Sequence, residues 1–544
     1  MPEGLLFVLW DLSTLWSGVF RWFERISRDA PQISSLEWGL VALYLAVMVV
    51  LSAYGLHRYQ LICLYYRHRG RATHEPDQRF AELPSVTVQL PLYNEQFVVE
   101  QLLAAVCRLD YPKDRLQIQV LDDSTDETSE IAGKAVERWA AEGYPVEYTH
   151  RRHRHGFKAG ALQAGLDTAR GELIAVFDAD FQPLPDFLRR TVHHFTGPNV
   201  GVVQSRWTFR NRDHSVLTRI QAMLLDGHFV FEHGARARSG RFLNFNGTAG
   251  VLRRTMIEDA GGWQHDTLTE DTDLSYRAQM RGWRYVYLSD VEVPSELPTD
   301  LTAFQVQQAR WAKGLIQTGR KTLPALLTSD LPGAVKLEAF FHLTSNVSYP
   351  LMVLLSLLLL PSAVVRFYHG HVAFLWVDIP LLLGTFSSLS TFYLLAQKEL
   401  FPSSWRWKLV LTPALVATGI GLTITNTRAV LEGLLGMPSP FQRTAKYTTD
   451  RRRARQARLR YQRSSGWLPL ANFAAGTYFA CCTVYLAGIG NWTTLPFVTL
   501  FVAGFYLTAG LLLVQAYEFR WEAQGESHAG RRIDPLTVPR LRRP

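Results

Sequence analysis

Two carboxylates stand two residues apart in Asp178-Ala179-Asp180, directly after a buried apolar strand pattern at 172–177. Just past a strand end, such a pair can jointly hold one hard divalent cation, Mg²⁺ or Mn²⁺. The cation can bridge the phosphates of a nucleoside diphosphate and neutralise it as a leaving group. Strand-to-loop corners often carry solvated or capping Asp residues, so this pair alone does not decide between the two interpretations.

A second acidic pair, Asp122-Asp123, ends the preceding strand pattern in the same manner. Its carboxylates can accept hydrogen bonds from a nucleobase or assist the metal. They can equally cap the helix that follows, a role for which Ser124, Thr125 and Asp126 compete.

A third acidic segment, Thr269-Glu270-Asp271, precedes an amphipathic helix. Transfer of a sugar with inversion needs one carboxylate to take the proton from the attacking hydroxyl, on the face opposite the leaving group. Asp271 is the candidate for that general base, and capping of the helix is its alternative role.

Gln307, Arg310 and Trp311 stand at i, i+3 and i+4, so they share one face of a predicted helix. The planar fork of Arg310 can clamp a diphosphate, and the indole of Trp311 can stack on a pyranose ring. An isolated Arg-Trp pair usually serves surface packing. Here Gln307 and Gln308 stand beside it, just before a hydrophobic hairpin.

Two glycine-containing segments complete the set of candidates. Lys158, in HGFKAG, precedes the start of a helix, where a cation and backbone amides can receive phosphate oxygens. Asn246-Gly247-Thr248-Ala249-Gly250 suits close approach of the backbone to a ligand, although an ordinary loop has the same composition.

Alternating strand and helix patterns position these residues. Strand patterns at 85–90, 115–121 and 172–177 alternate with helix patterns at 95–107, from Thr125 onward, and at 158–169. This order predicts a doubly wound, mostly parallel sheet with right-handed crossovers. Ligands of such sheets bind beyond the carboxyl ends of the strands. Asn94-Glu95, Asp122-Asp123 and Asp178/Asp180 all fall at those ends, so we expect one shared site there.

Long apolar stretches flank this segment. The chain has 544 residues, of which 47% are apolar, and it is too long for one ordinary domain. The stretches with few or no charges are each about long enough to cross ~30 Å of hydrocarbon; they are 36–56, 338–361, 372–396, 407–425, 467–488 and 494–517. Residues 81–330 carry charges throughout, so the predicted order is membrane, soluble domain, membrane.

The formal charge of +9 is concentrated in one run, because residues 443–463 hold nine Lys or Arg and one acid. The run lies between hydrophobic stretches, so a cytosolic loop near anionic headgroups accounts for it, and nucleic acid is not expected as a partner. By the same rule, the arginines of 57–79 place the following domain in the cytosol. If 407–425 crossed the bilayer, the basic run would lie outside. We therefore expect 407–425 to re-enter the membrane or to lie partly in its plane.

Residues 4–23 predict an amphipathic helix on the membrane rather than a cleaved signal peptide or a span. They lack a basic leader and contain Asp11 among aromatic residues. The four cysteines show neither metal-ligand spacing nor a disulfide framework, and we expect them to be reduced and structural.

The chain resembles the family 2 glycosyltransferases, specifically the processive cellulose synthase group, in five motifs taken in order: LDDSTD (121–126), FDAD (177–180), FNGTAG (245–250), TED (269–271) and QQARW (307–311). It is most similar to the plant cellulose synthase-like A and C branches and their bacterial relatives, which make β-1,4-linked mannan, glucomannan or glucan. The later FQRTAK (441–446) is similar to the gating loop of that group. The tail at 518–544 is too short for the cyclic-dinucleotide-binding domain of bacterial cellulose synthase, so regulation by that messenger is not expected.

The resemblance implies a GT-A-like α/β domain inserted between α-helical transmembrane segments. It implies that Asp178 and Asp180 bind Mg²⁺ or Mn²⁺ and that Asp271 is the catalytic base. The residues expected at the nucleotide-sugar are Asn94, Glu95, Asp122, Asp123, Lys158, Gln307 and Arg310, and those expected at the acceptor glycan are Trp311, Asn246, Gly247 and Glu270. Phe441, Thr444 and Lys446 would belong to a loop that closes over the bound substrate.

The expected organisation begins with an interfacial segment at 1–35, a span at 36–57, the glycosyltransferase domain at 80–300 and interfacial helices at 301–335. It continues with spans at 338–361 and 372–396, a membrane or in-plane stretch at 407–436, the basic gating-type loop at 437–465, spans at 467–488 and 494–517, and a basic cytosolic tail at 518–544.

The sequence thus predicts a multi-pass membrane enzyme with a cytosolic, metal-dependent catalytic domain. We expect an inverting, processive β-glycosyltransferase that moves a hexose from GDP-mannose, UDP-glucose or GDP-glucose to a β-1,4-type glycan, with export along the helices as a hypothesis. Two alternatives stay open: a non-processive lipid glycosyltransferase, and a transporter gated by a nucleotide-binding domain. The separate candidate base Asp271 argues against the transporter, because gating needs no proton acceptor.

Overall fold

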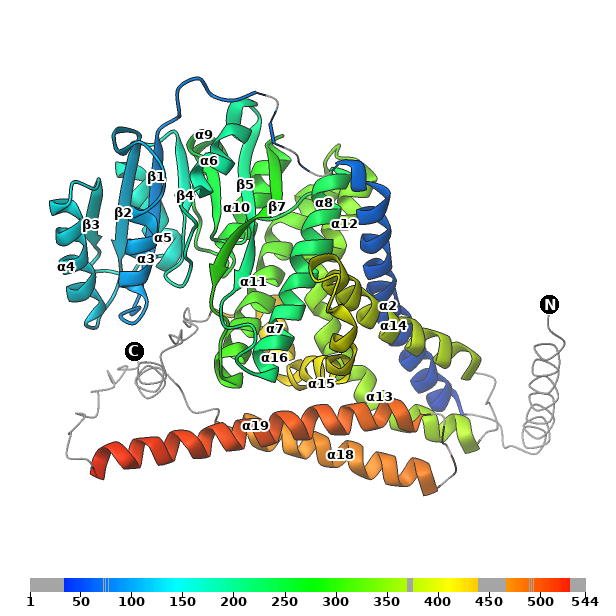
Figure 1. The fold of residues 1–544 in the computed structure, drawn as a ribbon. Helices are drawn as coiled ribbons and strands as arrows, with labels where there is room; N and C mark the ends of the chain where they lie inside the picture. The colour runs from blue at the N-terminus through cyan, green and yellow to red at the C-terminus, as the bar shows by residue number, and fades with distance from the viewer. Residues whose placement is uncertain are drawn as a thin grey trace.

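The computed structural model describes residues 34–368, 375–438 and 466–528, except 72, 74, 77, 489, 491 and 493. Figure 1 shows an α/β domain and, below it and to its right, a group of long helices. Three predictions fall outside the described residues: the helix at 4–23, the basic run 443–463 with the gating residues Phe441, Thr444 and Lys446, and the tail beyond 528.

The α/β domain is built on a seven-stranded sheet in the order β3-β2-β1-β4-β6-β5-β7. Its strands are β1 (Val86–Leu92), β2 (Leu116–Asp122), β3 (Val146–His150), β4 (Leu173–Val176), β5 (Val200–Phe209), β6 (Gly250–Arg253) and β7 (Arg284–Ser295). Neighbouring strands are parallel except at β6, which runs antiparallel to both β4 and β5. The predicted doubly wound, mostly parallel sheet is confirmed. The reversal at β6 was not predicted. It arises because the helical connection after β5 brings the chain back to the edge of the sheet where β5 ends, so β6 starts there and runs in the opposite direction.

Helices cover both faces of the sheet, so its central strands are buried on both sides. One face packs against α3 (Val99–Cys107), α4 (Thr128–Ala141) and α6 (Phe187–Thr191), and the other against α5 (Phe157–Thr168), α9 (Arg254–Asp259) and α10 (Glu270–Met280). The strands and helices predicted up to residue 177 are confirmed, although α3 and α4 begin about one turn later than expected.

Polar side chains inside the sheet fix the register of β1 against β2. The Thr87 hydroxyl donates to Gln117 Oε1 at 2.8 Å, and Gln89 Nε2 donates to Gln119 Oε1 at 3.1 Å. A slip of one residue would break both bonds and turn buried side chains to the opposite face. In this register Leu92 pairs with Asp122, so the two strands end at one level, where the polar segments begin.

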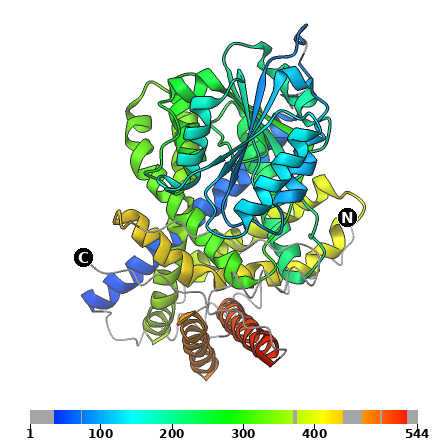
Figure 2. The ribbon, with the colours of Figure 1, turned by 90° about the vertical axis from the view of Figure 1, so that its left-hand side faces the viewer.

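Among the described residues, four helices are long and apolar enough to cross a membrane: Ser35–Arg67, Gly333–Arg366, Leu468–Gly488 and Leu495–Phe519. They comprise α2 (Ser35–Arg67), α12 with α13 (Gly333–Thr344 and Ser348–Tyr368), α18 (Leu468–Gly488) and α19 (Leu495–His528). Helices α18 and α19 lie side by side in both views (Figures 1 and 2). These helices contain the predicted spans at 36–57, 338–361, 467–488 and 494–517, and crossing of a bilayer stays a prediction.

The two other predicted membrane stretches are helical as well. The predicted span 372–396 coincides with α14 (Leu375–Leu400), which runs beside α2 (Figure 1). The stretch 407–436 coincides with η7 (Trp405–Leu411), α15 (Thr412–Gly421) and α16 (Thr423–Leu434), and the chain bends by 44° between α15 and α16. Such a bend is typical of a broken span or a re-entrant loop, so the predicted in-plane or re-entrant path remains open to test.

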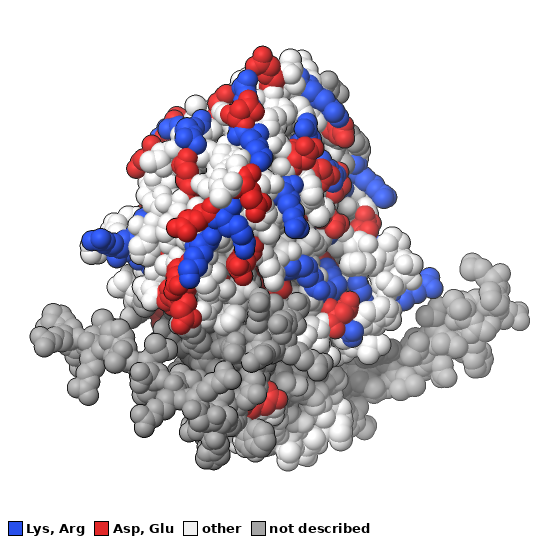
Figure 3. Space-filling view, turned by 60° about the vertical axis from the view of Figure 1, so that its left-hand side comes forward, with Lys and Arg blue, Asp and Glu red and all other residues white. Residues whose placement is uncertain are grey.

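The distribution of charge separates the same two parts. On the face shown in Figure 3, Lys, Arg, Asp and Glu side chains crowd over the α/β domain, whereas the described surface of the helices below it is mostly white. Helices with few surface charges suit an apolar solvent.

One long helix, α11 (Leu301–Thr328), lies against both parts. Its N-terminus is capped by Asp300, whose Oδ1 accepts a hydrogen bond from Ala303 N at 2.7 Å. At Gly314 the helix packs closely on the segment before α10, since a Cβ at this position would lie 2.9 Å from Thr269 N. The missing side chain therefore lets α11 lie directly against the Thr269-Glu270-Asp271 segment.

Candidate active site

A cavity opens at the carboxyl ends of β1, β2 and β4, where the sequence predicts a shared site. The predicted residues that line it are Glu95, Asp123, Lys158, Asp178, Asp180, Asn246, Gly247, Glu270, Asp271, Gln307, Arg310 and Trp311. These residues come from seven separate segments of the chain, and the fold brings them to one place. Asn94 and Asp122 are not in the lining.

Asp178 and Asp180 follow β4 at the floor of the cavity. Asp178 N donates to Thr248 Oγ1 at 2.9 Å, which ties this turn to the FNGTAG loop, and Asp178 Oδ1 accepts a hydrogen bond from Lys158 Nζ at 2.5 Å. In the described part of the chain, no three His, Cys, Asp or Glu side chains group closely enough to hold a metal ion. Two carboxylates nonetheless fit Mg²⁺, which typically takes one or two protein carboxylates and completes its shell with phosphate oxygens and water.

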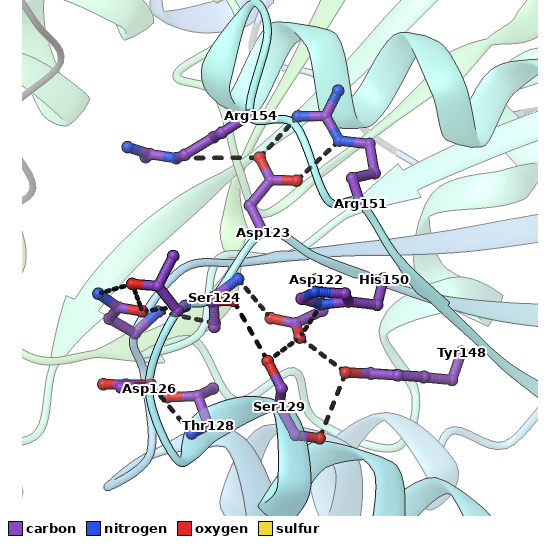
Figure 4. A network of polar contacts seen from close by, with 12 residues as sticks. Asp122, Asp123, Ser124, Asp126, Thr128, Ser129, Tyr148, His150, Arg151 and Arg154 are labelled. Carbon is purple, nitrogen blue, oxygen red and sulfur yellow. Dashed lines mark hydrogen bonds and ion pairs between the residues drawn. The ribbon is translucent and has the colours of Figure 1, made fainter.

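Asp123 forms the side of the cavity nearest to β2 and is only 4% exposed. The Arg151 guanidinium donates two parallel hydrogen bonds to this carboxylate, from Nε to Oδ1 at 2.7 Å and from a terminal nitrogen to Oδ2 at 2.6 Å (Figure 4). Arg154 Nε lies 3.9 Å from the same carboxylate. Two guanidinium groups thus fix the orientation of Asp123.

The neighbouring Asp122 turns the other way and is fully buried. Its oxygens accept hydrogen bonds from Ser124 N at 2.9 Å, the Ser129 hydroxyl at 2.6 Å and the Tyr148 hydroxyl at 2.7 Å, and His150 Nδ1 lies at 2.9 Å (Figure 4). Although burial raises the pKa of Asp122, these hydrogen bonds outweigh it and the net pKa is lowered. The residue therefore organises the turn behind Asp123.

Asn94 supports the same turn. Its backbone has a φ of 56°, in the left-handed region that Asn tolerates. Its Oδ1 accepts a hydrogen bond from Thr125 N at 2.9 Å, and its own N–H donates to Ser124 Oγ at 2.8 Å. Asn94 thereby joins the end of β1 to the end of β2.

Asp271 lies in the first turn of α10, and its Oδ1 accepts a hydrogen bond from Thr272 N at 2.7 Å. Burial and the adjacent charge of Glu270 raise the pKa of Asp271 to about 7, against the opposing effects of Lys158 and Arg310. A carboxylate with such a pKa can accept a proton near neutral pH. The arrangement is therefore suited to a general base.

Gly247 sets how closely the FNGTAG loop approaches this carboxylate. Its φ is +80°, and a Cβ there would lie 2.9 Å from Asp271 Oδ2 and 3.4 Å from Lys158 Nζ. Lys158 Nζ also donates to the Gly247 carbonyl at 2.9 Å. Only glycine satisfies both the backbone conformation and the close approach.

Two cations balance the acidic groups. Burial lowers the pKa of Lys158, but the charges of Asp178, Glu270 and Asp271 outweigh it and the net pKa is raised. Burial also lowers the pKa of Arg310, with the same three acids opposing it. The charges of Asp178, Glu270 and Asp271 therefore act on both Lys158 and Arg310. The two cations place positive charge where it could bind a diphosphate.

Sequence reasoning missed Tyr93 and Arg154, which also line the cavity. The Arg154 guanidinium lies 3.3 Å from the centre of the Tyr93 ring, a cation–π contact. Their position beside Asn94-Glu95 and four residues before Lys158 was the available signal.

A second cavity continues from the first and shares Trp207, Leu225, Asn246, Thr269, Asp271 and Trp311 with it. Its far walls come from α12, α13, α14, α15 and the connection after α15, through residues such as His342, Met352, Leu389 and Val416. The candidate base therefore stands between a cavity in the α/β domain and a cavity among the apolar helices.

The family described as glycosyltransferase like family 2 matches residues 84–314. Similar curated proteins include the probable glucomannan 4-beta-mannosyltransferase 7 of Oryza sativa subsp. japonica, 41% identical over 333 residues, which are 58% of this chain and 57% of that protein. Glucomannan 4-beta-mannosyltransferase 2 of Arabidopsis thaliana is 44% identical over 261 residues, 47% of this chain and 49% of that protein. The chain spans about half the length of these curated relatives.

Among solved structures, a mannosyltransferase from Pyrobaculum calidifontis in complex with GDP-Man and Mn2+ is similar at a TM-score of 0.48 and 22% identity, covering 73% of this chain and 100% of that chain. The family match and the mixed sheet identify residues 84–314 as a glycosyltransferase family 2 domain with a GT-A-like fold. The resemblance to glucomannan and mannan synthases, predicted from the motifs, is confirmed by the curated relatives.

Proposed function

We propose that this protein is a membrane-embedded, inverting β-mannosyltransferase that moves mannose from GDP-mannose to a growing β-1,4-linked glycan. The observation that carries the proposal is the convergence of Asp123, Asp178, Asp180, Asp271 and Arg310, distant in sequence, around one cavity. The choice of mannose rests on the relatives, which are named as glucomannan 4-beta-mannosyltransferases.

In this proposal an acceptor hydroxyl gives its proton to Asp271 while its oxygen attacks the anomeric carbon of the donor. The bond from that carbon to the diphosphate oxygen breaks, and GDP leaves with the electron pair. With a pKa of about 7, a substantial fraction of Asp271 is ionised at neutral pH, and the ionised form still has enough proton affinity to act as a base. Attack from the side opposite GDP gives inversion.

Basic and amide groups of the chain would bind the leaving diphosphate. Lys158 lies between Asp178 and Gly247, and Arg310 faces the same acids from α11, so positive charge flanks the space between them. Gln307, one turn before Arg310, lines the same cavity. Asp178 and Asp180 would hold a divalent cation, Mg²⁺ or Mn²⁺, which when bound neutralises charge on the diphosphate.

The second cavity supports a path for the product. It begins at Asp271 and Trp311 and ends among helices that are apolar enough for a bilayer. Trp311 would stack on the terminal sugar, and the growing chain would pass along this cavity as it lengthens. The catalytic domain would then face the cytosol, where nucleotide sugars are available.

The test is the purified protein in lipid nanodiscs, supplied with GDP-mannose, GDP-glucose or UDP-glucose and either Mg²⁺ or Mn²⁺. We expect a β-1,4-linked polymer from GDP-mannose, identified by product length and NMR of the linkage. Absence of transfer from every donor would contradict the enzymatic proposal. A lipid carrying a single sugar would instead establish the non-processive alternative.

A further inference from the structure

A second polar group lies in the cavity beyond Asp271, on a π-helix. The helical run between β5 and β6 comprises α7 (Val216–Gly227), the π-helix η4 (His228–His233) and α8 (Gly234–Ser239). π-Helical turns are rare and frequently occur at functional sites. This one places His228 and Glu232 in the wall of the second cavity, together with Asn246, Asp271 and Trp311.

His228 joins Glu232 to the loop that touches the candidate base. Its Nδ1 lies 2.7 Å from Glu232 Oε2, and its Nε2 lies 3.2 Å from Asn246 Oδ1. Asn246 precedes Gly247, whose backbone lies against the Asp271 carboxylate. Glu232 is therefore linked to the catalytic end of the cavity by two hydrogen bonds and one close backbone contact.

The Glu232 carboxylate is charged and accessible from the cavity, with a side chain that is 33% exposed. Its contacts with described residues, to His228 at 2.7 Å and to Arg236 at 3.9 Å, both use Oε2. Burial raises the pKa of Glu232, but His228 and Arg236 outweigh it and hold the pKa well below its usual value. Oε1 is thus an acceptor that a ligand in the cavity can use.

Groups outside the cavity hold this pair in place. Arg236 Nε donates to Glu338 Oε1 at 2.9 Å, and Glu338 Oε2 lies 3.0 Å from His57 Nε2 on α2. Arg236 and Glu338 are almost completely buried. Arg236 in turn lies 3.9 Å from Glu232 Oε2. These buried charges therefore orient the Glu232 carboxylate before a ligand enters the cavity, which lowers the entropic cost of binding.

The polar and aromatic part of this wall, around Glu232, suits a glycan better than an acyl chain. Trp207, Trp311, Tyr349 and Tyr393 line the same cavity, and flat aromatic faces next to hydrogen-bond acceptors suit pyranose rings. A hydrocarbon chain would desolvate the carboxylate without returning a hydrogen bond, which is costly. Sugar hydroxyls donate to a carboxylate and so replace the lost water.

We propose that Glu232 is a binding residue for the acceptor glycan, accepting hydrogen bonds from hydroxyls of a ring beyond the one at Asp271. His228 is its positioning residue, since both of its ring nitrogens are engaged with Glu232 and Asn246. The inference rests on the proposed function, because it assumes that the second cavity receives a glycan.

The experiment uses the full chain in nanodiscs with GDP-mannose and β-1,4-mannooligosaccharide primers of increasing length. Glu232→Gln is expected to raise the KM for the primer about 10- to 100-fold, the effect of losing a hydrogen bond to a charged group. The value of kcat and the affinity for GDP should change little. His228→Gln should raise the primer KM in the same direction by a smaller factor.

A matched control is Glu130→Gln on α4. Glu130 Oε1 also accepts a bond within its own helix, from Lys134 Nζ at 2.6 Å, but it lies on the exposed surface. This variant should keep the wild-type primer KM.

Two outcomes would overturn the inference. One is an unchanged primer KM in Glu232→Gln and His228→Gln while the wild type elongates primers. The other is a loss of GDP binding in these two variants in parallel with the loss of primer binding. If the wild type transfers no sugar, the proposed function fails, and a tryptophan-fluorescence titration with mannooligosaccharides still decides the inference. Weaker glycan binding by Glu232→Gln would support it, and equal binding would refute it.

Discussion

The two ends of the catalytic cavity hold their carboxylates in opposite ways. At the proposed donor end, Arg151 donates two hydrogen bonds to Asp123, and Asp178 pairs with Lys158 at 2.5 Å. At the proposed acceptor end, burial and the neighbouring Glu270 raise the pKa of Asp271 to about 7. Ion pairs orient the first two carboxylates, whereas the raised proton affinity of Asp271 lets it accept a proton. In the proposed mechanism, the neighbours of these acids, and not their residue type, divide the roles among them.

The largest expected effect comes from removing the proton acceptor. Asp271→Asn keeps the size of the side chain and its hydrogen bond from Thr272 N, so the protein should fold and bind GDP. We expect kcat to fall on the order of a thousandfold, in the middle of the range for loss of a general base. Initial rates with GDP-mannose and calorimetry with GDP measure the two quantities. Turnover of Asp271→Asn near the wild-type rate would show that Asp271 is not the proton acceptor.

Substitution at the proposed donor end should also lower activity, but through weaker binding of the nucleotide. Asp180→Asn is expected to weaken GDP binding in the presence of Mn²⁺ and to lower kcat/KM for GDP-mannose on the order of a hundredfold. Raising the Mn²⁺ concentration should restore part of the activity, which it should not do for Asp271→Asn. The comparison fails if Asp180→Asn binds Mn²⁺ and GDP as tightly as the wild type.

The loop between the two ends offers a third test. Gly247→Ala would place a Cβ 2.9 Å from Asp271 Oδ2 on a backbone with a φ of +80°. We expect a loss of about 1 kcal/mol in stability and a fall of ~10- to 100-fold in kcat, because the base is displaced. Thermal unfolding and initial rates check both. An alanine variant with normal activity would show that the close approach is not needed.

The pH dependence of kcat/KM tests the assignment of Asp271 as the base without any substitution in the protein. A base works when ionised, so kcat/KM should fall about tenfold per pH unit below pH 7 and level off above it. The raised pKa of Asp271 also favours its protonated form in the fold. That stabilising contribution is complete below pH ~4, the unfolded value, and is lost as the pH rises through 7. Thermal unfolding of Asp271→Asn should lack this loss. A rate that is flat between pH 5 and 8 would contradict the assignment.

The sequence could predict the cavity because its residues lie at the carboxyl ends of parallel strands, which meet at one edge. It could not separate Asp122 from Asp123. Successive strand residues point to opposite faces, so one of the two had to turn away, and the choice depends on β3, which the sequence patterns did not reveal. His150 and Tyr148 on that strand contact Asp122 and leave Asp123 to the cavity.

The acceptor side was harder to predict for a related reason. Glu232 and His228 reach the cavity only through a π-helical turn, and the helical periodicity of the sequence does not signal the extra residue in such a turn. Close packing at Gly314 likewise depends on contact between α11 and a segment more than forty residues earlier in the chain. Local patterns predict elements, whereas these features arise only from how the elements pack.

The most direct test is a cryo-electron microscopy structure of the Asp271→Asn variant in nanodiscs with GDP-mannose and Mn²⁺. The account predicts Mn²⁺ bound between the DAD carboxylates and the diphosphate, the guanosine beside Asp123, and the mannose facing position 271. Nucleotide bound elsewhere, or in this cavity with its sugar turned away from position 271, would contradict the account.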